Sequence, residues 1–561
     1  MSIHNRILMD LGQRARNRLR LPLNPNTQHN TLSLVHSSVL FRHGDRSPSF
    51  NIFEPDIIQA SHEAFAWAAE LPSDNTLGDL EEFAPTRRVR DVGDGELVLS
   101  HTTERPRDAE LGSFGRLSRV GVHQAHDLGS WLSGFYTPSI NSTIRVSSSN
   151  YARTIATAQA VVRSFLPGDT PKGVVQVQVH DPKSEYLNVY PFFTSLQQRM
   201  LELTKQGWFQ DFDQTVVKER QRLVNLLPTF SFHLRKFSWL TCQDHFRCRD
   251  LRRGHHWSGI PKSVDGKAWK DSWLHLESLE RLRDTFDATD NNDNGVLSKK
   301  ELTRVVHKLL PKSIIGNNDI DILFETLKRK NIDDTGGDAD VKDCVGADVG
   351  ADVGADGDAD ADADADADSG ADGSGVSWDD FVQLLGDGLP TLSKSKDEDE
   401  LWSLRPVVEE YTIRRFGMWY SDRDVLSMAT DGLIGAMNRS QDEVIETLSK
   451  DGGGLKDVGG RLAVHYNLMC GHDVTVLPLL HLLGAKKEAN QWPGYCCVLM
   501  LELMRDADED EYYVRVLWHP GRTGVGQDDT DEYCRPLLLR QNDEYQGDEC
   551  VTLKEFRNLT A

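Results

Sequence analysis

Two guanidinium groups flank a histidine directly after an apolar, strand-like run near the start of the chain. The run occupies residues 32–41, Arg42-His43-Gly44 follows it, and Arg46 comes two residues later. Guanidinium groups bind phosphoryl oxygens through paired, charge-assisted hydrogen bonds. Nearby cations disfavour a second positive charge on an imidazole, and a neutral imidazole nitrogen can attack phosphorus. The pattern therefore predicts phosphoryl chemistry centred on His43.

Further charged groups stand at two later junctions of the same kind. Arg153 begins a predicted helix after the predicted strand 143–149, and His472-Asp473 follows a third predicted strand, 461–469. Backbone N–H groups at a helix start also favour phosphate. In a parallel sheet the carboxyl ends of the strands share one edge, where ligands bind. We therefore expect these groups to meet His43 in a single site.

These segments resemble the histidine acid phosphatases, which form branch 2 of the histidine phosphatase superfamily. Arg42-His43-Gly44-x-Arg46-x-Pro48 is similar to the family's RHGxRxP signature, and His472-Asp473 is similar to its later HD pair. The run Leu117-Ser118-x-x-Gly121-x-x-Gln124 resembles another family element. The resemblance covers residues 31–166 and 460–561 and, more weakly, helices around 400–450. It implies an α/β fold with a mostly parallel sheet, flanking helices and a helical cap.

The resemblance also implies a role for each matching residue. His43 would form a phosphohistidine intermediate, and Asp473 would protonate the leaving oxygen. The groups that would hold the phosphoryl oxygens are Arg42, Arg46, Arg153 and His472. A carboxylate beside a bound phosphate has its pKa raised by like-charge repulsion, which suits a proton donor. No metal would be needed for the chemistry.

The segment after the HD pair narrows the expected substrate. Residues 474–480 and Trp492-Pro493 look most like the lysophosphatidic acid phosphatase subgroup, which implies a phosphomonoester substrate, either a lipid or a small molecule. An inositol polyphosphate phosphatase is the alternative, but such enzymes tend to line the cleft with additional basic residues. No such set can be placed in the cleft from sequence. The Arg/His-rich patch at residues 247–256 is expected by default to be solvated surface, and contact with an anionic substrate or lipid headgroups is the alternative.

Residues 290–301 fit the twelve-residue EF-hand loop, with Gly295 at the sharp turn and apolar helical patterns on both sides. The expected calcium ligands are Asp290, Asn292, Asn294, the Val296 carbonyl, Ser298 and Glu301. Calcium would have a structural or regulatory role. A degenerate second hand, with Asp380 at its twelfth position, is expected to pair with this loop through a short β contact.

Charge and composition limit the remaining possibilities. The 561 residues hold 63 Lys and Arg against 87 Asp and Glu, and residues 333–372 alone hold fifteen Asp. That segment repels itself and buries no apolar surface, so we expect it to be disordered. A pI near 5.2 argues against nucleic-acid binding through a basic field. No apolar run has the length of a transmembrane segment.

The sequence predicts a core divided between the two ends of the chain. The predicted parts are a basic N-terminal extension at 1–30, an α/β core at 31–166 and 456–561, a helical cap at 167–273 and 389–455, and an EF-hand module at 274–388. The Arg-rich extension lacks a secretory apolar region. We expect an intracellular protein, cytoplasmic or mitochondrial, that is not secreted by a standard signal peptide.

The function predicted from these observations is an acid phosphatase with a calcium-binding insertion. The alternative from another class is a calcium-binding sensor or scaffold on an inactive phosphatase fold.

Overall fold

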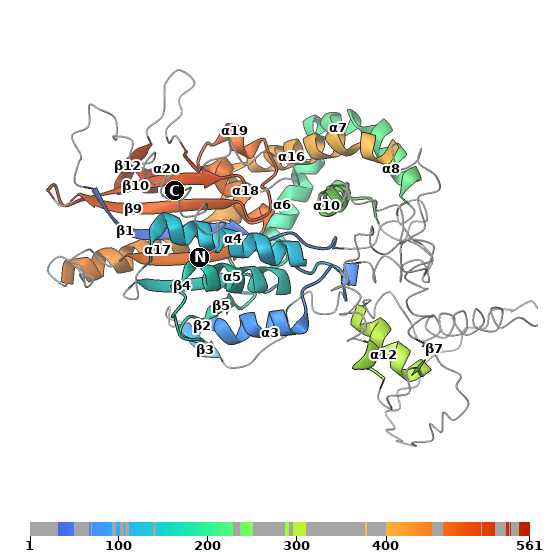
Figure 1. Ribbon diagram of the computed structural model, residues 1–561. Coiled ribbons are helices and arrows are strands. Elements are labelled where there is room, and N and C mark those ends of the chain that lie inside the picture. Colours follow the sequence, from blue (N-terminus) through green and yellow to red (C-terminus); the bar gives the residue numbers. More distant parts are fainter. Residues whose placement is uncertain are drawn as a thin grey trace, which may run out of the picture.

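The computed structural model describes most of the predicted core and cap and a small part of the predicted EF-hand module (Figure 1). The described residues are 32–49, 67–68, 70–91, 97–100, 106, 112–138, 142–227, 230, 236–250, 286–290, 296–309, 376–377, 400–450, 464–506, 508–521, 534–537, 539 and 549–561. The basic extension at 1–30, the Asp-rich segment at 333–372 and the proposed ligands Asn292 and Asn294 lie outside them.

A ten-stranded sheet runs through the molecule in the order β11-β10-β9-β1-β8-β4-β5-β2-β3, with β12 paired to β10. Its strands are β1 (Leu32–Arg42), β2 (Thr86–Asp91), β3 (Leu97–Ser100), β4 (Thr143–Ser148), β5 (Val177–His180), β8 (His465–Gly471), β9 (Val498–Asp506), β10 (Glu511–His519), β11 (Arg535–Pro536) and β12 (Cys550–Thr552). The five central strands β1, β8, β4, β5 and β2 pair in parallel, and antiparallel strands extend the sheet on both sides. The expected α/β fold with a mostly parallel sheet is confirmed.

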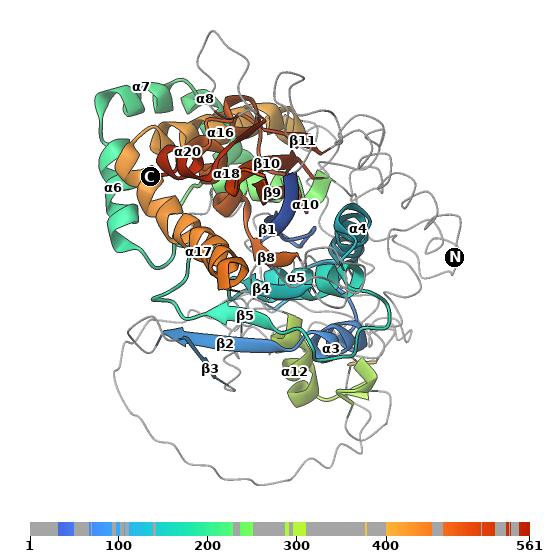
Figure 2. The same cartoon turned by 90° about the vertical axis from the view of Figure 1, so that its left-hand side faces the viewer.

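Helices cover both faces of the sheet, as Figure 2 shows. On one face α3 (Asp74–Phe83), α4 (Arg119–Tyr136) and α5 (Ala152–Phe165) pack on strand residues such as Val39 and Phe41. On the other face α17 (Arg423–Lys450), α18 (Asp473–Leu482) and α20 (Leu553–Leu559) pack on residues such as Leu40. Side chains of successive strand residues point to opposite faces, so an apolar run such as 39–41 suits a strand buried on both sides.

A group of helices forms a cap beside the carboxyl ends of the central strands. Its helices are α6 (Thr194–Thr204), α7 (Gly207–Gln214), α8 (Val217–Leu226), α10 (Trp239–Asp250) and α16 (Arg405–Tyr420). One apolar cluster joins α8, α10 and α16, and a second joins α6, α7 and α16 to the start of α17. Because α17 and α18 also belong to the core, the second cluster anchors the cap to the sheet. The short α19 (Lys486–Ala489) follows α18.

Two short strands and one helix are described in the predicted EF-hand module. The strand β6 (Val296–Leu297) pairs antiparallel with β7 (Val376–Ser377), and α12 (Lys299–Leu309) follows β6. In the figures these elements lie outside the helices that cover the sheet. None of the helices among the described residues has the length and apolar character that a membrane crossing requires.

Two glycines bring the loop after β1 against the start of α4. A Cβ atom added at Gly44 would lie 2.4 Å from the carbonyl oxygen of Gly121, and one added at Gly121 would lie 2.1 Å from that of Asp45. Such distances leave no room for a side chain. The amide of Gln124 accepts a hydrogen bond from the Asp45 N–H at 2.8 Å, and the Ser118 hydroxyl donates to the Asp45 carboxylate. These contacts fix the backbone that carries His43.

We predict that Gly121→Ala destabilises the protein, because the new methyl group must push the loop and α4 apart. The free energy of unfolding should fall by about 1–3 kcal/mol, the usual cost of overpacking. Gly78→Ala is the matched control, since Gly78 is exposed in α3 with nothing within 4 Å of an added Cβ. That variant should gain up to about 1 kcal/mol from helix propensity. Urea denaturation measures both, and equal stabilities would refute the proposed steric role of Gly121.

Candidate active site

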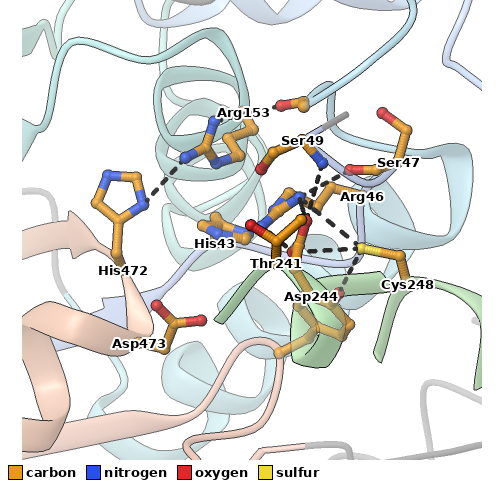
Figure 3. Close-up of polar contacts among 12 residues, drawn as sticks. His43, Arg46, Ser47, Ser49, Arg153, Thr241, Asp244, Cys248, His472 and Asp473 are labelled. Carbon is orange, nitrogen blue, oxygen red and sulfur yellow. Dashed lines mark hydrogen bonds and ion pairs between the residues drawn. The ribbon is translucent and has the colours of Figure 1, made fainter. Parts of the chain in front are cut away.

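Three strand-to-helix junctions bring the sequence-predicted phosphate-binding and catalytic residues together, as Figure 3 shows for five of them. The strands β1, β8 and β4 are parallel neighbours, so their carboxyl ends meet at one edge of the sheet. A cavity of about 190 Å³ lies at this edge. Its lining includes all six predicted residues, namely Arg42, His43, Arg46, Arg153, His472 and Asp473.

His43 presents one free ring nitrogen in this group of arginines. Its side chain is 1% exposed, and its Nδ1 lies 2.8 Å from the Gly44 carbonyl oxygen. A carbonyl only accepts hydrogen bonds, so Nδ1 carries the proton and Nε2 keeps its lone pair. Burial holds the pKa of His43 well below its ordinary value, and the charges of the surrounding arginines lower it further. The ring is therefore neutral and can act as a nucleophile.

Arg42 is held in place by three contacts. Its guanidinium donates to the Pro493 carbonyl oxygen at 2.6 Å, forms an ion pair with the Asp473 carboxylate at 2.7 Å and lies 4.4 Å from the centre of the Tyr495 ring. The side chain is buried. This fixed guanidinium suits a group that must meet a phosphoryl oxygen without reorganising.

Arg153 and His472 are coupled across the cavity. The Arg153 guanidinium donates to His472 Nδ1 at 3.4 Å, so His472 carries its proton on Nε2, which donates to the Ser149 hydroxyl at 2.8 Å. Burial places the pKa of His472 well below its usual value, with Arg153 as the next cause. His472 is thus neutral, and together with Arg153 it forms one side of the site.

Asp473 opens α18 in surroundings that favour its ionised form. Its carboxylate accepts hydrogen bonds from the Val474 N–H at 2.8 Å and the Trp492 indole at 3.0 Å. Burial alone would raise its pKa, but the charges of Arg42 and Arg46, aided by the Trp492 hydrogen bond, outweigh burial and lower the pKa to about 2. A proton donor at this position therefore needs a bound anion that offsets the arginine charges.

The cap helix α10 contributes polar residues to the same cavity, and sequence reasoning did not place them there. They are Thr241, Gln243, Asp244 and Arg247. The Asp244 carboxylate forms an ion pair with Arg46 and accepts the Ser49 N–H at 2.9 Å. Arg247 lies 3.4 Å from the Glu409 carboxylate of α16. Ion pairs thus join α10 both to the loop that follows β1 and to the cap helix α16.

The default interpretation of residues 247–256 as solvated surface is wrong for its first members. Arg247 lines the cavity and Arg249 is 5% exposed, whereas the residues after Asp250 lie outside the described part of the chain. The burial of Arg247 and Arg249 comes from contacts with segments that are distant in the sequence. A weak signal was available in the spacing of Gln243 and Arg247, which places both residues on one face of a helix.

A short loop before α6 also contributes to the lining of the cavity. The Glu185 carboxylate accepts the N–H groups of Leu187 and Asn188 at 2.7 and 3.2 Å, and Asn188 lines the cavity. Burial raises the pKa of Glu185 to about 7. Glu185 therefore fixes the loop from behind without facing the cavity itself.

The model of the histidine phosphatase superfamily (branch 2) matches residues 33–519. No curated protein matches the chain. Solved structures with a similar chain trace include the Citrobacter braakii phytase, at 12% identity and a TM-score of 0.39, covering 94% of this chain and 97% of that one. The Bifidobacterium longum multiple inositol polyphosphate phosphatase in complex with inositol hexasulfate matches at 10% identity and a TM-score of 0.39, covering 96% and 94%.

We predict that His43 makes stability sensitive to mild acid. An unfolded chain protonates this histidine as the pH falls through about 6.5, whereas the folded chain does not, so acidification favours unfolding. His43→Gln removes this effect. Below pH 6.5 the free energy of unfolding of the variant should therefore gain on that of the wild type by about 1.4 kcal/mol per pH unit.

Urea denaturation at pH 7.5, 6.5 and 5.5 provides the measurement. The exposed His123 on α4 supplies a matched control variant, His123→Gln, which removes a histidine from the surface. A difference between wild type and His43→Gln that stays constant with pH would show that His43 is not kept neutral.

Proposed function

The chain belongs to branch 2 of the histidine phosphatase superfamily and is a phosphatase, and we propose that it hydrolyses phosphomonoesters through a phosphohistidine formed on His43. The observation that carries this proposal is the placement of His43. Its Nε2 lone pair stands free in a cavity with three arginines, while Nδ1 is held by the Gly44 carbonyl. This combination provides a nucleophile and the charge to stabilise a phosphoryl transition state.

The reaction proceeds in two displacements. Nε2 attacks phosphorus and the bond from phosphorus to the ester oxygen breaks, while Asp473 gives a proton to the leaving oxygen. A water molecule then attacks the phosphohistidine, Asp473 takes up a proton from it, and phosphate leaves with His43 restored. The arginines and His472 hold the phosphoryl oxygens throughout.

Asp473 can donate a proton only if its pKa rises, and substrate binding would raise it. A pKa near 2 leaves this carboxylate ionised at any mildly acidic pH, because Arg42 and Arg46 stabilise its charge. A phosphoryl group bound to the same two arginines offsets their charge and raises the pKa of Asp473. A phosphomonoester monoanion also carries a proton at acidic pH, since its second pKa is about 6. The proton can therefore enter with the substrate and pass to Asp473.

The cavity favours a substrate with one phosphate. Four arginines line it, and three carboxylates offset three of their charges, namely Asp244 and Asp473 at the cavity and Glu409, the partner of Arg247. One phosphate monoanion balances the remaining charge. Among the lining residues that the structure describes, Arg247 is the one arginine beyond the three predicted to bind phosphate, and it already has Glu409 as a partner. A ligand with several phosphates would find few further cations among the described lining residues.

Apolar groups at the same cavity support a lysophosphatidate substrate. Leu240, which is 41% exposed, lines the cavity together with Val474 and Trp492. Lysophosphatidate combines one phosphate with a glycerol hydroxyl and an acyl chain that suits such a surface. The local sequence resemblance of residues 474–480 points to the same class.

We predict that oleoyl-lysophosphatidate gives a higher kcat/KM than phytate or an aryl phosphate in assays from pH 4 to 7. His43→Ala should reduce turnover at least about a thousandfold, as loss of a covalent nucleophile does elsewhere. His123→Ala is the control and should keep the wild-type rate. A preference for phytate would favour the inositol polyphosphate alternative. No turnover of any of the three would favour the sensor or scaffold.

We also propose that residues 290–301 bind calcium. The side chains of Asp290 and Glu301, at the first and twelfth positions, are 8% and 5% exposed. The Ser298 N–H and hydroxyl donate to Glu301 Oε2 at 2.9 and 2.8 Å, so positions nine and twelve are already close. Among the described residues no group of three His, Cys, Asp or Glu side chains forms a metal site. The proposed loop draws its other ligands from Asn, Ser and a backbone carbonyl instead.

The pairing of β6 with β7 supports a two-loop arrangement. Leu297 lies opposite Val376, and Val296 lies opposite Ser377. Leu297 is position eight of the first loop, and Val376 is position eight of a second loop that ends at Asp380. The short contact therefore aligns the two loops at equivalent positions, as expected for paired hands. Calcium bound in the first loop would therefore also affect the second loop, because the β6–β7 contact joins the two.

We predict that Glu301→Gln weakens calcium binding at least about tenfold, because it removes the bidentate carboxylate of the loop. Isothermal titration calorimetry of the full chain measures this. Asp287→Asn serves as a matched control, since Asp287 is exposed just before the loop and its loss should change affinity little. Equal weakening in both variants, or no calcium binding by the wild type, would refute the proposed site.

A further inference from the structure

Gln243 is a buried amide whose hydrogen-bonding groups have no partner among the described residues. Its side chain is 1% exposed, and within this part of the chain nothing forms a hydrogen bond with the amide nitrogen or the amide oxygen. Such a group costs free energy unless something satisfies it. Gln243 lines the cavity at His43, so a bound ligand can supply the missing hydrogen bonds.

The face of α10 shows which part of a ligand Gln243 meets. Leu240, Gln243 and Arg247 are spaced by three and four residues, lie on one side of the helix and all line the cavity. The predicted phosphate-binding residues come from the sheet edge, whereas this helix belongs to the cap. Gln243 is therefore on the cap side of the cavity, where the leaving group of an ester held at the sheet edge is expected to lie.

Gln243 shares its cavity with the predicted phosphoryl-binding groups. Asp244, next along the chain, pairs directly with Arg46 of the catalytic loop. The cavity of about 190 Å³ is lined by Gln243 as well as by Asp244 and Arg46, so we expect the Gln243 amide to meet an atom a few bonds from the ester oxygen. An amide offers both a donor and an acceptor, and a hydroxyl group matches both.

We propose that Gln243 determines specificity by hydrogen-bonding a hydroxyl on the carbon adjacent to the phosphoester carbon, so that the preferred substrates are phosphomonoesters of polyols. This inference rests on the proposed phosphatase function and names the substrate class more closely. A buried site built for a hydroxyl discriminates against a ligand that lacks it, because the protein amide is then left unsatisfied. Lysophosphatidate with a free central hydroxyl belongs to this class.

The test compares two small substrates that differ in this feature. Glycerol 3-phosphate carries the adjacent hydroxyl, and 3-hydroxypropyl phosphate has the same carbon chain and terminal hydroxyl without it. The wild type should favour glycerol 3-phosphate by at least about tenfold in kcat/KM. Gln243→Leu keeps the approximate shape and removes the amide, so it should lose that preference through a lower value for glycerol 3-phosphate. The ratio of kcat/KM for the two substrates does not depend on the fraction of enzyme that is folded. Gln243→Ala is a second variant that also removes the amide.

Gln441 offers a matched control. It is also fully buried with both amide atoms unpartnered, but it lies in α17 and does not line the cavity. Gln441→Leu should therefore keep the wild-type preference. Equal losses on both substrates in Gln243→Leu, or a wild type without preference, would overturn the inference while leaving the phosphatase function intact. A wild type that hydrolyses no phosphomonoester at all, aryl phosphates included, would overturn the proposed function itself.

Discussion

The concentration of positive charge at one edge of the sheet constrains the whole structure. Arg42, Arg46, Arg153 and Arg247 all line a single cavity, and buried cations are tolerated only when charge and hydrogen bonds compensate them. The compensation comes from distant parts of the chain. Asp473 at the start of α18 pairs with Arg42, and Asp244 of the cap pairs with Arg46. Charge balance thus holds the core and the cap together around the cavity.

The titratable groups beside these arginines differ in protonation state. Burial is the main reason that His43 and His472 stay neutral, and the arginine charges add to it. For Asp473 burial favours the protonated form, but the arginine charges outweigh it and keep the carboxylate ionised. A single anion bound by the arginines reverses the field locally. In the proposed mechanism, His43 is therefore ready as nucleophile before substrate arrives, whereas Asp473 becomes a competent acid only with substrate in place.

The sequence was most informative where chemically reactive residues follow directly after predicted strands. The apolar run before Arg42 and the junctions at Arg153 and His472 predicted both the parallel sheet and the convergence of the six site residues, because parallel strands share one edge. The contribution of α10 could not be predicted in this way. Gln243, Asp244 and Arg247 are polar, and sequence alone treats such residues as solvent-exposed until tertiary contacts with Arg46 and Glu409 show otherwise. The EF-hand loop was predicted from ligand spacing, and its calcium remains a proposal.

The position of β1 in the sheet has a consequence for biosynthesis. Both edges of this strand pair with β8 and β9, which the ribosome produces only after the cap and the predicted EF-hand module. Until then the strand leading to His43 has neither of its partners, and an unpaired apolar strand is prone to wrong association. Contacts of such high sequence separation also form slowly. We expect the edge of the sheet that carries His43 to be the last part of the core to assemble, so that β1 stays exposed to wrong association for most of the time that the chain is being synthesised.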